Sequence, residues 1–509
     1  MRVQTPGGRT QSDSRCAGFF SRSRPPPRFP PLLLPTAMVT LGFKTDSTPY
    51  RPLFATPRSL STKFFALFAV ISVVYFTHSF VPSEYKPDLS SFRFSSPRVR
   101  GTCPPRSYAA GEWVAKPPPT NRTDFNSSSD VYDYLGFQGC ASTREVYWHL
   151  AADKPALWDR FPRVASWQWQ TPSDCEVREL DPAAIVKDLV EQGGWLLIGD
   201  SVTENHFFSL SCLLFPHVRA TPDYIENPYF DRGWPQHLYL EPSSPLVKSI
   251  RFPPGFDIET TPLVTFRRVD LLFEQPQLDA LYHSLHPDSP YVSANESIFS
   301  DEAAWNLSPE EYVKIFTSPL PQGNYATMVV STGGHWTTTL FSGLKDTNMF
   351  KDGIENVLGF FSEAMEAWAR EVQALLDDAE EAEWASRRFS IGRSRGRKMA
   401  PRQVVARAYL PGHEDCHDHR DPWTSYKPGR WGWYNWNQIG DFNDAFEAVL
   451  DSRKYPDIHF LPIDRPALLR PDAHSAGDCL HIMSGAGVLE GWTQYIWHYV
   501  TVELPGRVR

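Results

Sequence analysis

The 509-residue sequence has few cysteines, no internal repeat and no excess of positive charge over most of its length. Residues 1–63 carry ten Lys and Arg against two Asp, so the net charge of −9 leaves −17 for the remainder. Proteins that bind nucleic acid hold the phosphates with clustered Lys and Arg. The deficit of positive charge therefore argues against nucleic acid or another polyanion as a partner and favours a neutral substrate.

The composition is otherwise that of a globular protein. Hydrophobic residues make up 41% of the chain, which is enough to bury a large core. The 46 prolines and the aromatic content of 14% indicate long loops with many packing rings. The length suits one large α/β domain with extensions.

Six of the seven cysteines follow an apolar segment at 64–81, and only Cys16 precedes it. In an oxidising compartment these six could form three disulfides, in any of 15 pairings that the sequence does not distinguish. The same part of the chain holds all the N-glycosylation acceptor patterns, which begin at Asn121, Asn126, Asn295 and Asn306. Both observations favour a secretory lumen.

The N-terminal region predicts a membrane anchor. Residues 1–63 are rich in Pro, Arg and Ser, which is typical of a disordered tail, with a transit peptide as the alternative. Residues 64–81 contain no strongly charged side chain and nearly suffice to span a bilayer; the alternatives are a cleaved signal peptide or a buried helix. Positive charge before the segment predicts a cytosolic tail and a lumenal domain at 103–509. Pro- and Ser-rich composition predicts a stem at 82–102.

Three short runs that are mainly apolar and rich in β-branched residues predict strands of a parallel sheet that is covered on both faces, and each run leads directly into a loop of small or polar residues. Three amphipathic or apolar stretches predict helices between and after them. The predicted strands are Trp195–Ile198, Thr327–Val330 and Ile458–Ile463, and the predicted helices are Thr203–Leu214, Phe361–Trp384 and Asp441–Leu450. This alternation predicts a doubly wound, mostly parallel α/β sheet, whose sites lie at the carboxyl ends of the strands.

Ser201 lies where a predicted strand meets a predicted helix, so its hydroxyl would project from a tight turn at the carboxyl edge of the sheet. A serine hydroxyl is a weak nucleophile that needs a general base and donors for the developing oxyanion. The backbone N–H of Ser201 at a helix start is one such donor. For Gly-Asp-Ser alone, the alternative is a helix N-cap in a turn.

Asp478 and His481 supply a candidate base. Two residues three apart on one helical turn face the same way, so Asp478 could hold the imidazole while His481 removes the serine proton. The alternative for Asp-x-x-His alone is a surface hydrogen-bonded pair. Together, Ser201, Asp478 and His481 form a candidate catalytic triad.

From Cys103 onward the sequence resembles the PC-esterase or trichome birefringence-like family of polysaccharide O-acetyltransferases, of which we interpret it as a fungal-type member. The matching blocks are Gly111-Glu112-Trp113, Trp167-Gln-Trp169 with Cys175, GDSVTENHFFSLSCLL from Gly199, STGGHW from Ser331, Arg470-Pro-Asp472-Ala-His474 and DCLH from Asp478. Six blocks in this order form a specific signal.

The resemblance implies an SGNH-hydrolase-type fold and assigns the triad to Ser201, Asp478 and His481. It also implies transfer of acetyl through the serine to a hydroxyl of a wall or secretory polysaccharide. The acetyl donor would be acetyl-CoA or an acetylated intermediate used as a substrate, with no bound cofactor, and a membrane partner could supply acetyl. The expected location is the Golgi or ER membrane, in single-pass type II orientation. The alternatives are a carbohydrate acetyl esterase with the same triad and an inactive carbohydrate-binding protein.

Two departures from the family pattern fall near the expected oxyanion hole. The plant pattern has Arg-Asn where this chain has Glu204-Asn205, and Asn-Thr-Gly-His-Trp where it has Ser-Thr-Gly-Gly-His-Trp from Ser331. We predict that the oxyanion donors are Ser201, Gly333 and Asn205, although Gly333 and Gly334 could instead serve a turn that requires positive φ. The predicted substrate-binding residues are His335, Trp336, Arg470, Asp472, His474, Trp431 and Trp433.

Two further clusters bear on binding. Residues 412–419 concentrate His, Asp, Glu and Cys, but neighbours so close in sequence seldom converge on one ion, so we predict no metal site and interpret the segment as a polar loop near the active site. Six aromatic residues between Trp423 and Trp436 could present rings to sugar faces or could pack the loop onto the domain.

Overall fold

A seven-stranded sheet forms the centre of the computed structural model, which describes residues 102–118, 125–220, 235–289, 296–345, 353–389, 401–430, 432–451 and 453–504. Across the sheet the strands are β4 (Val218–Ala220), β5 (Gln236–Leu240), β6 (Pro262–Arg268), β3 (Gly194–Gly199), β7 (Tyr325–Ser331), β8 (Gln403–Arg407) and β9 (Ile458–Leu461). The strands from β6 to β9 run parallel, and β5 pairs antiparallel with both β4 and β6. The predicted mixed α/β class with a mostly parallel sheet is confirmed.

The central strands are apolar because helices cover both of their faces. Every residue of β3, β7 and β8 is buried. Burying a Leu, Ile or Val side chain contributes about 2 kcal/mol, so these strands supply much of the stability of the core. Their registers place Gly199, Arg268 and Ser331 side by side at one edge of the sheet.

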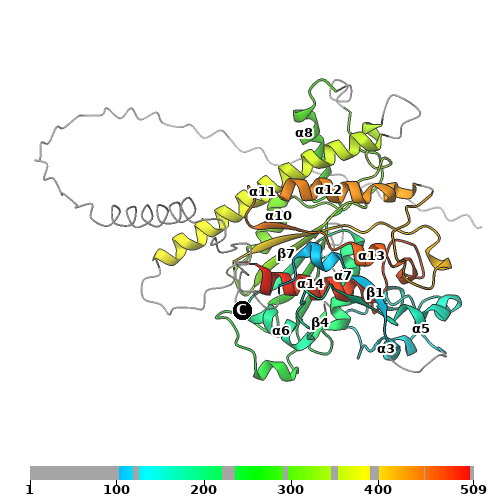
Figure 1. Ribbon diagram of the computed structural model, residues 1–509. Helices are drawn as coiled ribbons and strands as arrows, with labels where there is room; N and C mark the ends of the chain where they lie inside the picture. Colours follow the sequence, from blue (N-terminus) through cyan, green and yellow to red (C-terminus); the bar gives the residue numbers. More distant parts are fainter. Residues whose placement is uncertain are drawn as a thin grey trace, which may run out of the picture. The chain divides into compact units, whose positions relative to one another are not determined.

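Figure 1 shows α10, α11 and α12 on one side of the strands and α6 and α14 on the other. Contacts agree, since α10 and α12 pack on β7 and β9 whereas α6 and α7 pack on β3 and β6. The helices are α2 (Pro105–Ala109), α3 (Asp130–Leu135), α4 (Val146–His149), α5 (Phe161–Val164), α6 (Pro182–Glu191), α7 (Ser201–Leu213), α8 (Gln275–Leu285), α10 (Pro309–Phe316), α11 (Ile354–Phe389), α12 (Ile439–Leu450), α13 (Arg465–Leu468) and α14 (Val488–His498).

The three predicted helices are present with shifted ends. Helix α11 extends beyond the predicted 361–384 at both ends, because its apolar repeat already includes Val357 and Phe360, which are buried. Helix α7 begins at Ser201 rather than Thr203, because the Asp200 side chain accepts a hydrogen bond from the Val202 N–H and caps it.

Three disulfides join segments distant in sequence: Cys103–Cys175, Cys140–Cys212 and Cys416–Cys479. The first lies beside a small antiparallel sheet of β1 (Glu112–Ala115) and β2 (Trp167–Gln170). The second fastens a loop to α7, and the third fastens two loops at the carboxyl edge of the main sheet.

The predicted tail at 1–63, the predicted membrane anchor at 64–81 and all of the predicted stem at 82–102 except residue 102 lie outside the described residues, as do Asn121 and Asn295. Within the described ranges, no helix has the length and apolar character needed to cross a membrane. Of the remaining glycosylation acceptors, Asn126 is exposed and Asn306 is partly buried.

We predict that replacing both Cys140 and Cys212 with Ala lowers the free energy of unfolding by about 4 kcal/mol, because the crosslink closes a loop of 72 residues in the unfolded chain. Guanidinium denaturation of the oxidised wild type and the double variant would measure the difference. Equal denaturation midpoints would contradict the assignment of this disulfide.

Candidate active site

Ser201 stands at the tip of the turn between β3 and α7. Gly199 is required there, because a Cβ atom at this position would lie 2.6 Å from the carbonyl oxygen of Ser331 and 2.3 Å from Oγ1 of Thr203. Strand β3 can therefore lie flush against β7 and turn directly into the helix. The outcome is a serine hydroxyl at the carboxyl edge of the sheet, at the N-terminus of a helix.

The structure brings the three predicted triad residues together. The Ser201 hydroxyl donates to Nε2 of His481 at 2.7 Å. Nδ1 of His481 donates to Oδ2 of Asp478 at 2.8 Å, which leaves Nε2 as the acceptor. This is the arrangement in which a histidine can take a proton from a serine while a carboxylate fixes its tautomer.

The predicted helical turn at 478–481 is wrong, because this segment is a loop. Asp478 and His481 still face each other because Oδ1 of Asp478 accepts the backbone N–H groups of Leu480 and His481, both at 2.9 Å. One carboxylate therefore folds the loop with one oxygen and orients the imidazole with the other.

The pKa of Asp478 lies below its ordinary value. Burial alone would raise this pKa, but the hydrogen bond and charge of His481 and the two backbone N–H groups together outweigh it. Asp478 therefore stays ionised in mildly acidic solution and can stabilise the imidazolium form of His481.

The predicted oxyanion donors differ in their surroundings. In the described part of the chain, the backbone N–H groups of Ser201 and Gly333 have no protein acceptor. Gly333 has a φ of +151° and lies against the ring of Tyr409. Asn205 is fully buried, and its Nδ2 lies 2.9 Å from Nδ1 of His149. The roles of all three in catalysis remain predictions.

Glu204, one of the departures from the family pattern, forms a buried ion pair with Arg144 and accepts from Nε2 of Gln236 at 2.6 Å. Burial raises the pKa of Glu204, while Arg144 opposes the increase. The negative charge of Glu204 on α7 is thus balanced by Arg144, which lies in the loop before α4. No sequence motif near Arg144 indicates this pairing.

Most of the predicted substrate-binding side chains have partners inside the protein. Arg470 and Asp472 are fully buried and doubly hydrogen-bonded to each other, and Arg470 also donates to the carbonyls of Ala486 and Val164. Trp336 is buried and stacks on Phe341. The predicted role in substrate binding stays a prediction for these residues.

His335 and His474 differ in burial. His335 is partly exposed, with Nε2 3.8 Å from a carboxylate oxygen of Asp270. His474 is fully buried, and its Nδ1 lies 3.3 Å from the carbonyl oxygen of His481. Trp431 lies outside the described residues, and for Trp433 the structure gives only the backbone, in the 3₁₀ helix Trp433–Gln438.

Sequence reasoning missed two neighbours of the triad. The Trp148 ring lies edge-on to the His481 imidazole, with 5.1 Å between centroids. His149 stacks on Phe208, and burial, together with the charges of His481 and Arg144, holds its pKa well below the ordinary value. Both come from α4, which has no spacing relation to Ser201 that a motif could reveal.

The polar loop at 412–419 meets the triad loop. Cys416 is bonded to Cys479, which lies between Asp478 and His481 in the chain. The sulfurs of Cys416 and Cys479 lie near His417, but their bond leaves no thiolate in this group to bind a metal ion. The disulfide instead holds the triad loop against its neighbour.

The carboxyl edge of the mostly parallel sheet therefore carries a serine, a histidine and an aspartate that are hydrogen-bonded in that order. A site of this kind is suited to nucleophilic acyl chemistry.

No family model matches the sequence. The chain is similar to the Arabidopsis thaliana protein trichome birefringence-like 26, with 25% identity over 233 residues, which are 45% of this chain and 45% of that protein. It is also similar to trichome birefringence-like 23 of the same plant, with 30% identity over 69 residues, or 14% and 16% of the two chains. The chain thus matches less than half the length of either relative. These distant similarities support the trichome birefringence-like resemblance, and the fungal-type assignment stays a prediction.

We predict that Asp478→Asn lowers the rate of cleavage of a small acetyl ester by about 10⁴-fold, the scale known for loss of the triad aspartate in a serine protease. The amide would present an N–H to His481 and favour the tautomer that cannot accept the serine proton. Asp441→Asn, a change at an exposed position on α12, is the matched control. A rate within tenfold of wild type in Asp478→Asn would contradict the role assigned to this carboxylate.

Proposed function

We propose that the protein is an O-acetyltransferase that carries acetyl on Ser201 and passes it to hydroxyl groups of a polysaccharide. The observation that supports this most directly is the continuous hydrogen-bonded series from Ser201 through His481 to Asp478. The similarity to trichome birefringence-like proteins favours an acetyltransferase or esterase.

The first half-reaction acylates the enzyme. Nε2 of His481 accepts the proton of Ser201 as Oγ attacks the acetyl carbonyl, and the N–H groups of Ser201 and Gly333 stabilise the oxyanion. When the tetrahedral intermediate collapses, His481 returns the proton to the leaving group of the donor, and acetyl remains on Ser201 as an ester.

The second half-reaction reverses these roles with a sugar. A sugar hydroxyl gives its proton to Nε2 of His481 and attacks the acyl carbonyl, and the proton then returns to Ser201 as the acetylated sugar leaves. Water in place of the sugar would make the enzyme an esterase. The same triad serves both reactions, so the acceptor decides the outcome.

The proposal includes the setting that the sequence predicts: an SGNH-type fold, a single-pass anchor at 64–81 and a lumenal domain in the Golgi or ER. Three disulfides favour an oxidising compartment. The excess of acidic residues beyond 63 suits a neutral glycan better than an anionic one.

To test the proposal, the full-length protein from a secretory host would be incubated with 4-nitrophenyl acetate and a neutral oligosaccharide, and acetylated sugar and free acetate would both be quantified. We predict acetylated sugar with wild type and none above background with Ser201→Ala. Acetate alone would indicate an esterase. A well-folded wild type that produces neither would contradict the enzymatic proposal and favour a carbohydrate-binding protein.

A further inference from the structure

A cavity separate from the triad, which we call the second cavity to distinguish it from the triad site, opens at the same edge of the sheet and contains none of the triad residues. Its volume is about 700 Å³, and it lies at the carboxyl ends of β8 and β9, between α12, α13 and the loop that carries Tyr426. Strand β7 separates β8 from β3, which leads into Ser201. With about 4.8 Å between neighbouring strands, β8 and β9 lie about 10 and 14 Å from β3 across the sheet.

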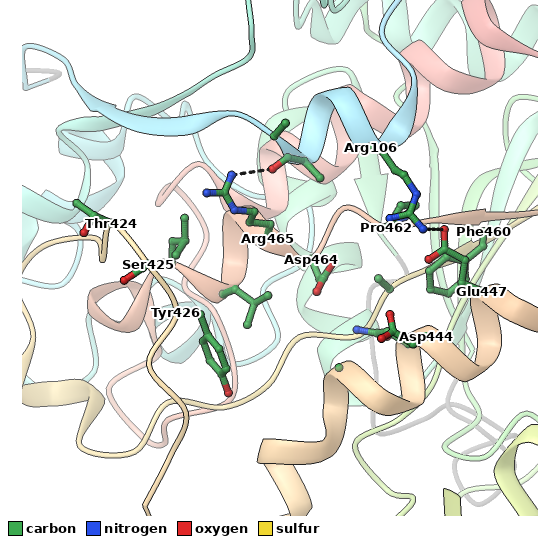
Figure 2. Close-up of a pocket in the computed structure, with 17 residues that line it drawn as sticks. Arg106, Thr424, Ser425, Tyr426, Asp444, Glu447, Phe460, Pro462, Asp464 and Arg465 are labelled. Atoms are coloured by element: carbon green, nitrogen blue, oxygen red, sulfur yellow. Dashed lines mark hydrogen bonds and ion pairs between the residues drawn. The ribbon is translucent and has the colours of Figure 1, made fainter. Parts of the chain in front are cut away.

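Asp464 is the central polar group of this cavity. Figure 2 shows its carboxylate between Arg465 on one side and Asp444 and Glu447 on the other. In the part of the chain that the structure describes, no side chain donates a hydrogen bond to this carboxylate, although Arg407 lies within electrostatic reach. Asp464 is partly buried, and its carboxylate faces the cavity with acceptor capacity that a ligand carrying hydrogen-bond donors can use.

The two cations that line the cavity are already engaged. Arg106 donates to Glu447 at 2.6 Å, and Arg465 donates to the carbonyls of Ala109 and Gly111 at 3.0 and 2.7 Å. Figure 2 draws the Arg106 guanidinium turned toward Glu447. The lining includes three carboxylates against these two cations, which disfavours a phosphate or carboxylate ligand.

Apolar surface completes the lining. The Tyr426 ring is 36% exposed, and Phe460, Leu468 and Leu469 also face the cavity. Rings of this kind can lie against the C–H faces of a sugar, while hydroxyl groups at the sugar's edge donate to a carboxylate. The combination matches a neutral, hydroxyl-rich ligand.

We propose that this cavity binds a neutral sugar unit of the acceptor chain, at a distance from the unit whose hydroxyl is acylated. The inference rests on the proposed glycan acceptor. It assigns Asp464 as the acceptor for sugar hydroxyls and Tyr426 as the ring that packs on the sugar face.

A series of close polar contacts connects the cavity and the triad. Nε2 of His413 donates to the carbonyl of Leu468, in the cavity wall, at 2.9 Å, so Nδ1 of His413 accepts from Nε2 of His474 at 2.6 Å. Nδ1 of His474 lies 3.3 Å from the carbonyl oxygen of His481. The wall of the cavity and the triad loop are therefore held as one unit.

The experiment measures binding separately from catalysis. Full-length Ser201→Ala protein, which cannot turn over substrate, would be titrated calorimetrically with the neutral β-1,4-linked hexasaccharides of glucose, mannose and xylose. In that background, Asp464→Asn and Tyr426→Ala are each expected to weaken binding of the best of these about tenfold or more, because each removes a direct contact. The matched controls are Asp441→Asn and Trp384→Ala, which are exposed outside the cavity and should leave the Kd unchanged.

The pH dependence gives a second readout. Burial and the neighbouring Asp444 and Glu447 raise the pKa of Asp464 to about 6, against the opposing effects of its own backbone N–H and of Arg407. Because the ligand donates to the carboxylate, binding should weaken as the pH falls through 6, and Asp464→Asn should remove this dependence.

Unchanged Kd values in both cavity variants, or no binding of any hexasaccharide, would overturn the assignment. The proposed function is tested separately, in Asp464→Asn and Tyr426→Ala proteins that retain Ser201. A small acetyl ester that does not reach the cavity should acetylate Ser201 in these variants at the wild-type rate. If the wild type binds the sugar but its Ser201 is not acetylated, the catalytic proposal is overturned and the cavity assignment stands.

Discussion

The contact between Ser201 and His481 joins two parts of the chain 280 residues apart, and the site depends on how firmly the later part is held. Arg470 anchors that part from within, because its buried guanidinium binds Asp472 and two backbone carbonyls. Removing one member of such a pair leaves a buried charge without compensation, which costs about 3–5 kcal/mol. The Cys416–Cys479 disulfide holds the same loop from outside. Arg470 and Asp472, which the sequence suggested as substrate contacts, thus stabilise the part of the chain that carries His481.

Buried charge also links the nucleophile turn to the second cavity. Arg407 ends β8 with its guanidinium 3.8 Å from the ring centroid of Trp492, and burial lowers its pKa to about 10. The charges of Asp200, Tyr409 and Asp464 oppose this decrease. Asp200 caps the helix that begins at Ser201, whereas Asp464 lies in the cavity, so one cation stabilises a carboxylate in each place.

Three of the seven strands of the central sheet, β3, β7 and β9, were predicted from the sequence. The unbroken apolar runs of β3 and β7 are visible there because both faces of these strands are covered, and so is the serine that follows β3. Strand β4 was missed because it has only three residues, and β5 because its exposure alternates along the strand. Strand β6 was missed because its seven residues end in two arginines, and β8 because only three apolar residues lie between Gln403 and Arg407. Strands of this kind are recognised by their neighbours in the sheet rather than by their own pattern.

Contacts within the candidate site could be predicted from spacing only where the residues lie close together in the sequence. Asp478 and His481 lie within hydrogen-bond distance, but in a loop rather than a helical turn, because spacing does not reveal that a carboxylate accepting two N–H groups can close a loop. Arg144, Trp148 and His149 reach the site through tertiary packing. Burial of Arg470 and His474 was equally invisible, since the same polar residues could line a surface.

The most direct test of this account is the mass of the protein after brief reaction with an acetyl ester, followed by peptide mapping of wild type, Ser201→Ala and His481→Ala. The account predicts one added acetyl group on Ser201 in the wild type, and none in either variant on the same timescale. Acetylation elsewhere with Ser201 unmodified, or equal acetylation of Ser201 in His481→Ala, would contradict the central claim that His481 activates Ser201 as the nucleophile.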